Sequence, residues 1–160
     1  MSACVLNGDF DIQVDYQLLE WPARNGVRMG IATGPDEFAE IIRMSWGQNE
    51  SSPSFDPAIP EVYLTNPNRA VIGTNDLSGK LRLTRIENVE TGYYYDSVIS
   101  SWIPLSSSGY TVSDVHLYLY AFSINDLFGD QEVKMAFDNL IVEGKKICKG
   151  RFTPANPPLF

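Results

Sequence analysis

The stretch DFDIQVDYQLLEWP, residues 9–22, carries a polar side chain at every second position of its first half. Two sets of residues alternate there: Asp9, Asp11, Gln13 and Asp15 against Phe10, Ile12, Val14 and Tyr16. Successive side chains of a β-strand point to opposite faces of its sheet. The stretch therefore predicts a strand with one face in the core and the other toward solvent.

Short segments of the same kind follow along the chain, rich in the Val, Ile, Tyr, Phe and Thr that favour strands. Gly-, Pro- and Asn-rich breaks separate them. Together they predict strands over 10–19, 26–33, 39–46, 61–65, 69–74, 80–86, 91–99, 111–123 and 132–142. Many short strands at this spacing predict an all-β fold, an antiparallel sandwich or barrel.

Three segments have a less clear pattern. Residues 35–44, PDEFAEIIRM, begin like the N-terminus of a helix, but Ile41 and Ile42 fit a strand at least as well. Residues 123–130 are compatible with a single helical turn, and SSSG at 106–109 is expected to be a break between strands.

Length and charge narrow the class of protein. With 160 residues, 44% of them hydrophobic, the chain suits one globular domain, predicted over 1–150 and followed by a Pro-rich tail over 151–160. The net charge of −8 repels phosphate backbones and anionic lipid, so nucleic acid is not expected as a partner. Since no apolar run approaches the roughly 18 residues of a membrane span, none is expected.

Two cysteines, Cys4 and Cys148, lie near opposite ends of the predicted domain. If the terminal strands lie side by side, these two residues can form a disulfide worth about 4–5 kcal/mol. Two unpaired, partly buried thiols are the alternative. No CxxC motif or Cys/His cluster is present, which argues against zinc and iron–sulfur sites.

Three stretches together resemble the concanavalin A-like lectin/glucanase superfamily, which includes laminin-G-like modules. They are the opening GDFDIQVDYQLLEWP, the middle SGKLRLTRIENVETGYYYDSVISSW and the closing MAFDNLIVEG. The resemblance covers most of the chain in its order of elements, although Ile86, Glu87 and Asn88 stand where the family usually has a glycine. It implies a two-sheet antiparallel β-sandwich of jelly-roll type. It also implies an extracellular or periplasmic location and, in many members, glycan binding.

The alternating carboxylates have three interpretations. Superfamily members that cleave glucans use the outer carboxylates of such a strand, here Asp11 and Asp15, but residues four apart lie about 13 Å from one another, too far for a retaining pair. A solvated strand face explains the row without any ligand. A calcium ion that ties the first strand to the last is the third interpretation, implied by the resemblance, with Asp9, Asp11 and Asp138 as ligands. Calcium takes about six to eight oxygen ligands, so backbone carbonyls and water would complete that site.

Aromatic and cationic residues are the candidates for ligand binding, because aromatic rings stack on sugar C–H faces and planar polar groups bind hydroxyls. TGYYYD with the following Trp102 is the most concentrated aromatic region, and it predicts a sugar platform. Alternation within other strands adds further candidates. The predicted ligand-binding residues are Arg43, Trp46, Arg82, Tyr93, Tyr94, Tyr95, Trp102 and His116. Packing in the core or on the surface is the alternative for each of them.

These observations favour a non-catalytic, lectin-like, carbohydrate-binding module of a larger extracytoplasmic protein, with a polysaccharide or glycan as its partner. His116 is the sole histidine and has no nucleophile motif near it, so triad chemistry is not expected. A glycoside hydrolase or lyase of the same fold is one alternative. A protein-interaction or structural module that associates with itself is the other.

Overall fold

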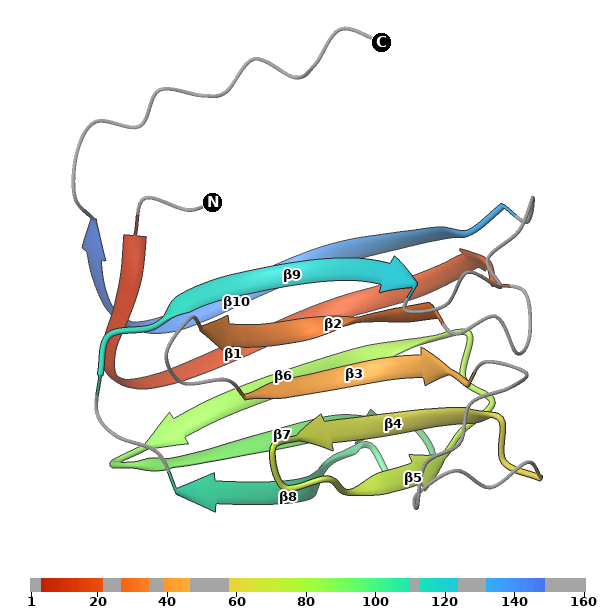
Figure 1. The fold of residues 1–160 in the computed structure, drawn as a ribbon, viewed down its shortest axis with the longest axis horizontal. Coiled ribbons are helices and arrows are strands. Elements are labelled where there is room, and N and C mark those ends of the chain that lie inside the picture. Colours follow the sequence, from red (N-terminus) through yellow and green to blue (C-terminus); the bar gives the residue numbers. More distant parts are fainter. Residues whose placement is uncertain are drawn as a thin grey trace, which may run out of the picture.

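Ten β-strands form two antiparallel sheets in the computed structural model, which describes residues 4–21, 27–34, 39–46, 58–109, 113–123 and 132–148 (Figure 1). Sheet A has the spatial order β10 (Lys134–Cys148), β1 (Cys4–Glu20), β6 (Ser78–Ile86), β7 (Val89–Asp96) and β8 (Ser101–Gly109). Sheet B has the order β5 (Val71–Gly73), β4 (Glu61–Asn66), β3 (Glu40–Ser45), β2 (Val27–Gly34) and β9 (His116–Ser123). The prediction of a two-sheet antiparallel β-sandwich of jelly-roll type is confirmed.

Strand β1 has the two faces that its alternating sequence predicts. Ile12 and Val14 are fully buried, whereas Gln13 between them and Asp11 and Asp15 beside them stay partly exposed. The strand pairs with β6 on one side and with β10 on the other. The first and last strands of the described chain are therefore neighbours, and the ladder places Cys4 opposite Cys148.

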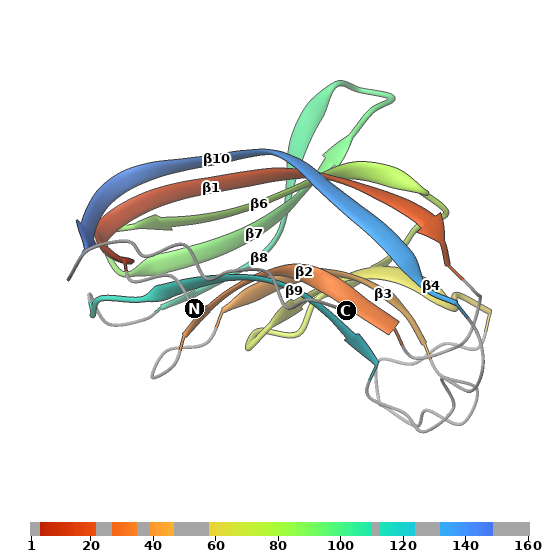
Figure 2. The same ribbon diagram turned by 90° about the horizontal axis from the view of Figure 1, so that it is seen from above.

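The main core lies between the two sheets. Apolar side chains of β1 and β6, among them Ile12 and Leu83, pack there with Met29, Ile31 and Ile41 of sheet B. Figure 2 shows sheet A arching over sheet B, and the side chains of this layer pack between the two sheets. Burial of a side chain of this size stabilises the fold by about 1.5–3 kcal/mol, so this layer accounts for most of the driving force.

A second buried cluster lies on the face of sheet B that points away from sheet A. Its members are Ile42, Met44, Trp46, Val62 and Leu64. Every residue of β3 is buried, so this strand is covered on both faces.

Two strands differ from the sequence prediction or resolve its ambiguity. β3 is a strand, so the helix suggested by residues 35–44 gives way to the alternative; residues 35–38 lie outside the described residues, as do 124–130 of the suggested helical turn. β8 includes residues 106–109, where a break was expected. It is an edge strand, and an edge tolerates both its serines and Pro104, because one side of the strand has no ladder to complete. Among the described residues, none belongs to a helix long and apolar enough to cross a membrane.

Candidate functional site

The face of sheet A that points away from sheet B gathers polar and aromatic side chains. The ladders place Gln13 of β1 opposite Arg82 of β6, and Arg82 opposite Tyr93 of β7. Tyr95 of β7 pairs with Trp102 of β8. Alternate residues of a strand share a face, so these side chains lie on the solvent side of the sheet.

Three rings and one guanidinium group of this face are linked in a chain of contacts, and we call Arg82, Tyr93, Tyr95 and Trp102 the outer aromatic cluster. The Arg82 guanidinium carbon lies 5.2 Å from the Tyr93 ring centroid and 5.7 Å from that of Trp102. Tyr95 meets Trp102 edge to face, with ring centroids 5.3 Å apart at 75°. All four side chains are half-buried, so the rings are held in place but keep surface open to solvent.

Asp11 fixes the position of Arg82. Its carboxylate accepts hydrogen bonds from Nε of Arg82 at 2.9 and 3.1 Å and from Nη2 at 2.5 Å, a two-pronged pair. These bonds raise the pKa of the Arg82 guanidinium, which partial burial alone would lower. Arg82 therefore stays charged and keeps one orientation beside the rings.

The β7–β8 hairpin carries all three rings, and its tip stands out from the sandwich (Figure 2). Asp96 Oδ1 accepts hydrogen bonds from the backbone N–H groups of Val98 at 2.8 Å and Ile99 at 3.3 Å. Ser100 has a φ of 52°, the left-handed conformation that closes the turn. This turn sets the register that brings Tyr95 opposite Trp102.

An open cleft of about 360 Å³ adjoins the cluster. Tyr95 forms part of its wall, and the polar groups that line it include Asp15, Asp76, Ser78 and Lys80. Lys80 Nζ lies 5.9 Å from the Tyr95 ring centroid and 3.1 Å from Asp15 Oδ1. A further cleft of about 500 Å³ continues on the other side of Asp15 toward β10.

Beneath this cleft, tyrosine hydroxyls connect its floor to the interior. Tyr63 donates a hydrogen bond to Asp76 Oδ2 at 3.0 Å, and its oxygen lies 2.6 Å from that of Tyr16. Because Tyr63 uses its proton for Asp76, the Tyr16 hydroxyl is the donor in the second bond. Burial, as the largest cause, raises the pKa of both tyrosines, so both are neutral at physiological pH.

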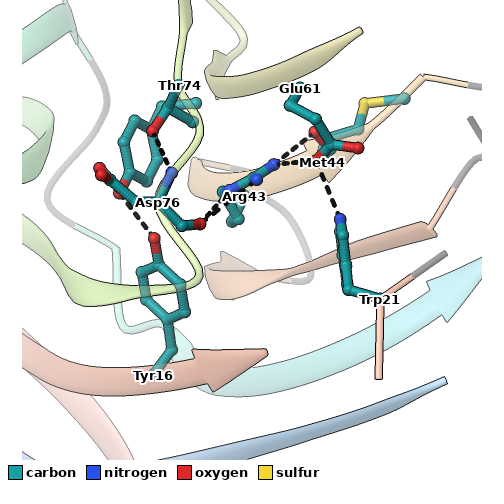
Figure 3. A network of polar contacts seen from close by, with 8 residues as sticks. Tyr16, Trp21, Arg43, Met44, Glu61, Thr74 and Asp76 are labelled. Atoms are coloured by element: carbon teal, nitrogen blue, oxygen red, sulfur yellow. Dashed lines mark hydrogen bonds and ion pairs between the residues drawn. The ribbon is translucent and has the colours of Figure 1, made fainter. Parts of the chain in front are cut away.

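Arg43 is the centre of the same interior network (Figure 3). Its Nη1 donates to Glu61 Oε2 at 2.6 Å and to the Met44 carbonyl at 2.9 Å, and its Nε and Nη2 donate to the Asp76 carbonyl at 3.3 Å each. The Trp21 indole N–H donates to the same Glu61 oxygen at 2.9 Å. The network joins β1, β3, β4 and the segment before β6. Arg43 therefore has a structural role.

The structure brings only some of the predicted ligand-binding residues together. Arg82, Tyr93, Tyr95 and Trp102 form one surface. Arg43 and Trp46 are almost fully buried in other places, and Tyr94 faces the core, where its ring stacks on Tyr63 with centroids 4.8 Å apart. His116 lies on β9 of the other sheet, 6.4 Å from the Tyr118 ring.

The three aspartates predicted to bind calcium do not converge. Asp11 binds Arg82, Asp9 Oδ1 accepts the backbone N–H of Glu87 at 2.7 Å, and Asp138 pairs with Asp15 across the β1–β10 ladder. Within the described ranges, no group of three or more His, Cys, Asp or Glu side chains is arranged to hold a metal ion. Calcium binding stays a prediction.

The cleft beside the cluster is not predicted by the sequence. In the sequence, Asp15 is one member of the carboxylate row, and no motif marks Lys80 or Asp76 as part of a site. The period-two pattern places Asp15 and Lys80 each on a polar face, but their pairing depends on the β1–β6 register, which joins residues 65 positions apart.

The chain matches no protein-family model and no curated protein sequence. Solved structures that share its fold include the following two. One is a functionally unknown protein from Saccharomyces cerevisiae, with 12% identity and a TM-score of 0.59 over 88% of this chain and 72% of that one. The other is the CBM2 module of the evolved Dit protein of Lactobacillus casei BL23 phage J-1, with 7% identity and a TM-score of 0.56 over 91% of this chain and 64% of that one. At these identities the likeness shows the fold alone, a β-sandwich, and assigns no superfamily.

Proposed function

We propose that this protein is a non-catalytic carbohydrate-binding module and that its ligand lies on the outer aromatic cluster. The observation that carries the proposal is the set of three rings and one fixed guanidinium group on a single exposed sheet face. Ring faces pack on the apolar faces of pyranoses, and the guanidinium and neighbouring carboxylates bind hydroxyls. The fold that the chain shares with a CBM2 module supports this proposal. Membership in the concanavalin A-like superfamily and an extracytoplasmic location belong to the same proposal.

The arrangement of the cluster suits binding to an extended chain. Tyr93, Tyr95 and Trp102 come from two neighbouring strands, and the cleft with Asp15 and Lys80 continues from Tyr95. Successive sugar units of one polysaccharide can therefore contact rings and polar groups in turn. Sandwich cores position such residues rigidly, which limits the entropy lost on binding.

Affinity electrophoresis in gels that contain soluble polysaccharides tests the proposal. We expect retardation of the wild type by at least one polysaccharide, and Trp102→Ala to weaken it by roughly 30-fold, the loss typical of a central aromatic anchor. Tyr118→Ala is the matched control, because Tyr118 is also a half-buried ring but lies on β9 of the other sheet. Thermal unfolding of each variant verifies that it is folded. Retardation that survives in Trp102→Ala and is lost in Tyr118→Ala would place the ligand on sheet B and overturn the proposal.

A glycoside hydrolase is the second candidate, because the carboxylates of Asp15 and Asp76 line one cleft. The contacts of these groups argue for the binding role: Asp15 is paired with Lys80, and Asp76 accepts a hydrogen bond from Tyr63. Release of reducing ends from a polysaccharide that the wild type binds, abolished in Asp76→Asn, would favour the hydrolase.

A further inference from the structure

We propose that the polysaccharide bound by the outer aromatic cluster is electrically neutral, because carboxylates of the protein already neutralise the cations of this face. The inference rests on the proposed function and specifies its ligand class. Arg82 is the first of these cations, with Asp11 on its Nε and Nη2. In this two-pronged geometry Asp11 occupies the donors that would otherwise bind the carboxylate of a uronic acid.

Lys80 is the second cation, and it is neutralised in the same way. Its Nζ lies 3.1 Å from Oδ1 and 3.3 Å from Oδ2 of Asp15, and Asn139 Nδ2 donates to Oδ2 at 2.8 Å. At 45% exposure the Lys80 side chain gains little stability from the pair. What the pair does change is the local field, because a cation beside an anion acts on a ligand as a dipole and not as a charge.

The wider surroundings are acidic. Glu143 lies opposite Asp11 in the β1–β10 register and adds to the negative field at Arg82. The whole chain carries a net charge of −8. A polyanion would meet no uncompensated cation at the cluster and would be repelled by the rest of the molecule.

Asp11 and Asp15 are each paired with a cation of the protein, so a cationic polysaccharide finds no unpaired carboxylate in these two residues. The acidic surroundings, Glu143 among them, attract such a chain only at long range, an attraction that high salt screens. Sugar hydroxyl groups do not need an unpaired charge on the protein in order to bind. Charge-paired side chains still offer N–H donors and carboxylate lone pairs, and Gln13, whose amide donates to Asp11 at 3.2 Å, adds an amide oxygen. A chain of hydroxyls and C–H faces matches this surface better than a charged chain does.

Affinity electrophoresis in four matched gels tests the inference: a neutral β-glucan, a neutral galactomannan, polygalacturonate and chitosan. Each is run at about 0.01 M and about 1 M salt, where the Debye lengths are about 30 and 3 Å. We expect the wild type to be retarded by a neutral polysaccharide, with an affinity that changes less than about twofold between the two salt concentrations.

Asp11→Asn tests the role of the carboxylate directly, because it leaves Arg82 charged and without its counter-ion. We expect this variant to gain affinity for polygalacturonate by about fivefold at low salt, the size of one ionic contact at a wet surface, and to lose the gain at high salt. Glu87→Gln removes the same charge at the β6–β7 turn, roughly 16 Å along the strand from Arg82, and we expect no gain there.

The outcomes separate this inference from the proposed function. If Trp102-dependent retardation occurs with polygalacturonate or chitosan and not with the neutral polysaccharides, the binding module stands and the neutral-ligand inference is wrong. If Asp11→Asn gains nothing for polygalacturonate, the neutralisation argument is wrong. If no polysaccharide of any charge retards the wild type, the proposed function fails, and the inference fails with it.

Discussion

Two arginines of this protein have the same kinds of partner and opposite settings. Arg43 binds Glu61 and lies 5.7 Å from the Trp21 ring, and Arg82 binds Asp11 and lies 5.7 Å from the Trp102 ring. The Arg43 side chain is 1% exposed, whereas that of Arg82 is 26% exposed. The same arginine–carboxylate–tryptophan combination is thus part of the interior in one place and available to a ligand in the other, so residue type alone does not identify a binding site.

The largest effect is expected when the interior network around Arg43 is broken. Arg43→Ala removes the cation between Glu61 and the Asp76 carbonyl and leaves a largely buried carboxylate without its counter-charge. We expect the free energy of unfolding to fall by about 3–5 kcal/mol, measured by urea denaturation. A loss below about 1 kcal/mol would contradict the structural role assigned to this arginine.

A smaller loss of stability is expected when the hydrogen bonds that join Tyr16, Tyr63 and Asp76 are broken. Tyr63→Phe deletes the hydroxyl that bonds Asp76 and Tyr16. We expect a loss of about 1–3 kcal/mol near neutral pH, because two polar groups lose a partner. Val62→Ala, at the adjacent position on the opposite face of β4, is a control that shortens an apolar side chain and leaves the hydrogen bonds of Tyr63 intact.

The same tyrosine gives the stability a pH dependence. Burial raises the pKa of Tyr63 in the folded state above the value of about 10 in the unfolded chain. The stabilising contribution is therefore complete below pH about 10 and is lost as the pH rises above it, because only the unfolded state then releases the proton. We expect the free energy of unfolding to decrease less steeply above pH 10 in Tyr63→Phe than in the wild type. Equal slopes of the free energy of unfolding against pH in the two proteins would show that the Tyr63 hydroxyl ionises as readily in the folded chain as in the unfolded chain.

Breaking the exposed cluster is expected to affect binding and hardly affect stability. Arg82→Ala removes a surface ion pair, which is worth about 0–1 kcal/mol, so urea denaturation should detect little change. Affinity for the polysaccharide that retards the wild type should fall, because the guanidinium contacts two rings of the platform. A stability loss as large as that of Arg43→Ala would remove the contrast between the two arginines.

The smallest effect concerns the end of the carboxylate row. Glu87 has a φ of 58° at the first position of the β6–β7 turn, and its N–H is bound by Asp9. Glycine adopts this conformation without the steric cost that a glutamate side chain has, so Glu87→Gly should stabilise the fold by about 0.5–1 kcal/mol. Binding should stay unchanged. A lower melting temperature in a differential scan would contradict the strain assigned to this residue.

The sandwich could be predicted because its strands keep a period of two. The alternation of residues 9–16 predicts which side of β1 is buried, and the structure agrees. β3 illustrates the limit of this reasoning, since all six of its residues are buried, including the polar Glu40, Arg43 and Ser45, so polar positions do not mark a solvent face here. Arg43 therefore looks like a surface cation in the sequence, although the interior supplies its partners.

The candidate site could be predicted only in part. Alternation separates Tyr94 from Tyr93 and Tyr95, but it does not say which set faces the core; that depends on the ring of Tyr63 from the other sheet. The contact of Asp11 with Arg82 joins residues 71 positions apart, and no local pattern encodes it. Pairing between distant strands is set by the whole fold, so the neutralised charges of this face become visible only in three dimensions.

The first and last strands of the described chain have a mechanical consequence. β1 and β10 run antiparallel, and the ladder that joins them ends at the pair Cys4–Cys148. Hydrogen bonds of an antiparallel ladder lie across the strands, so opposing forces on residues 4 and 148 load them one pair at a time. With both cysteines reduced, single-molecule pulling at these positions should need less force than pulling between residues 20 and 148, which shears the whole ladder; equal forces would contradict this. Under tension at residues 4 and 148, the domain should open like a zip along its β1–β10 seam, with the outer aromatic cluster on β6, β7 and β8 the last to be disturbed.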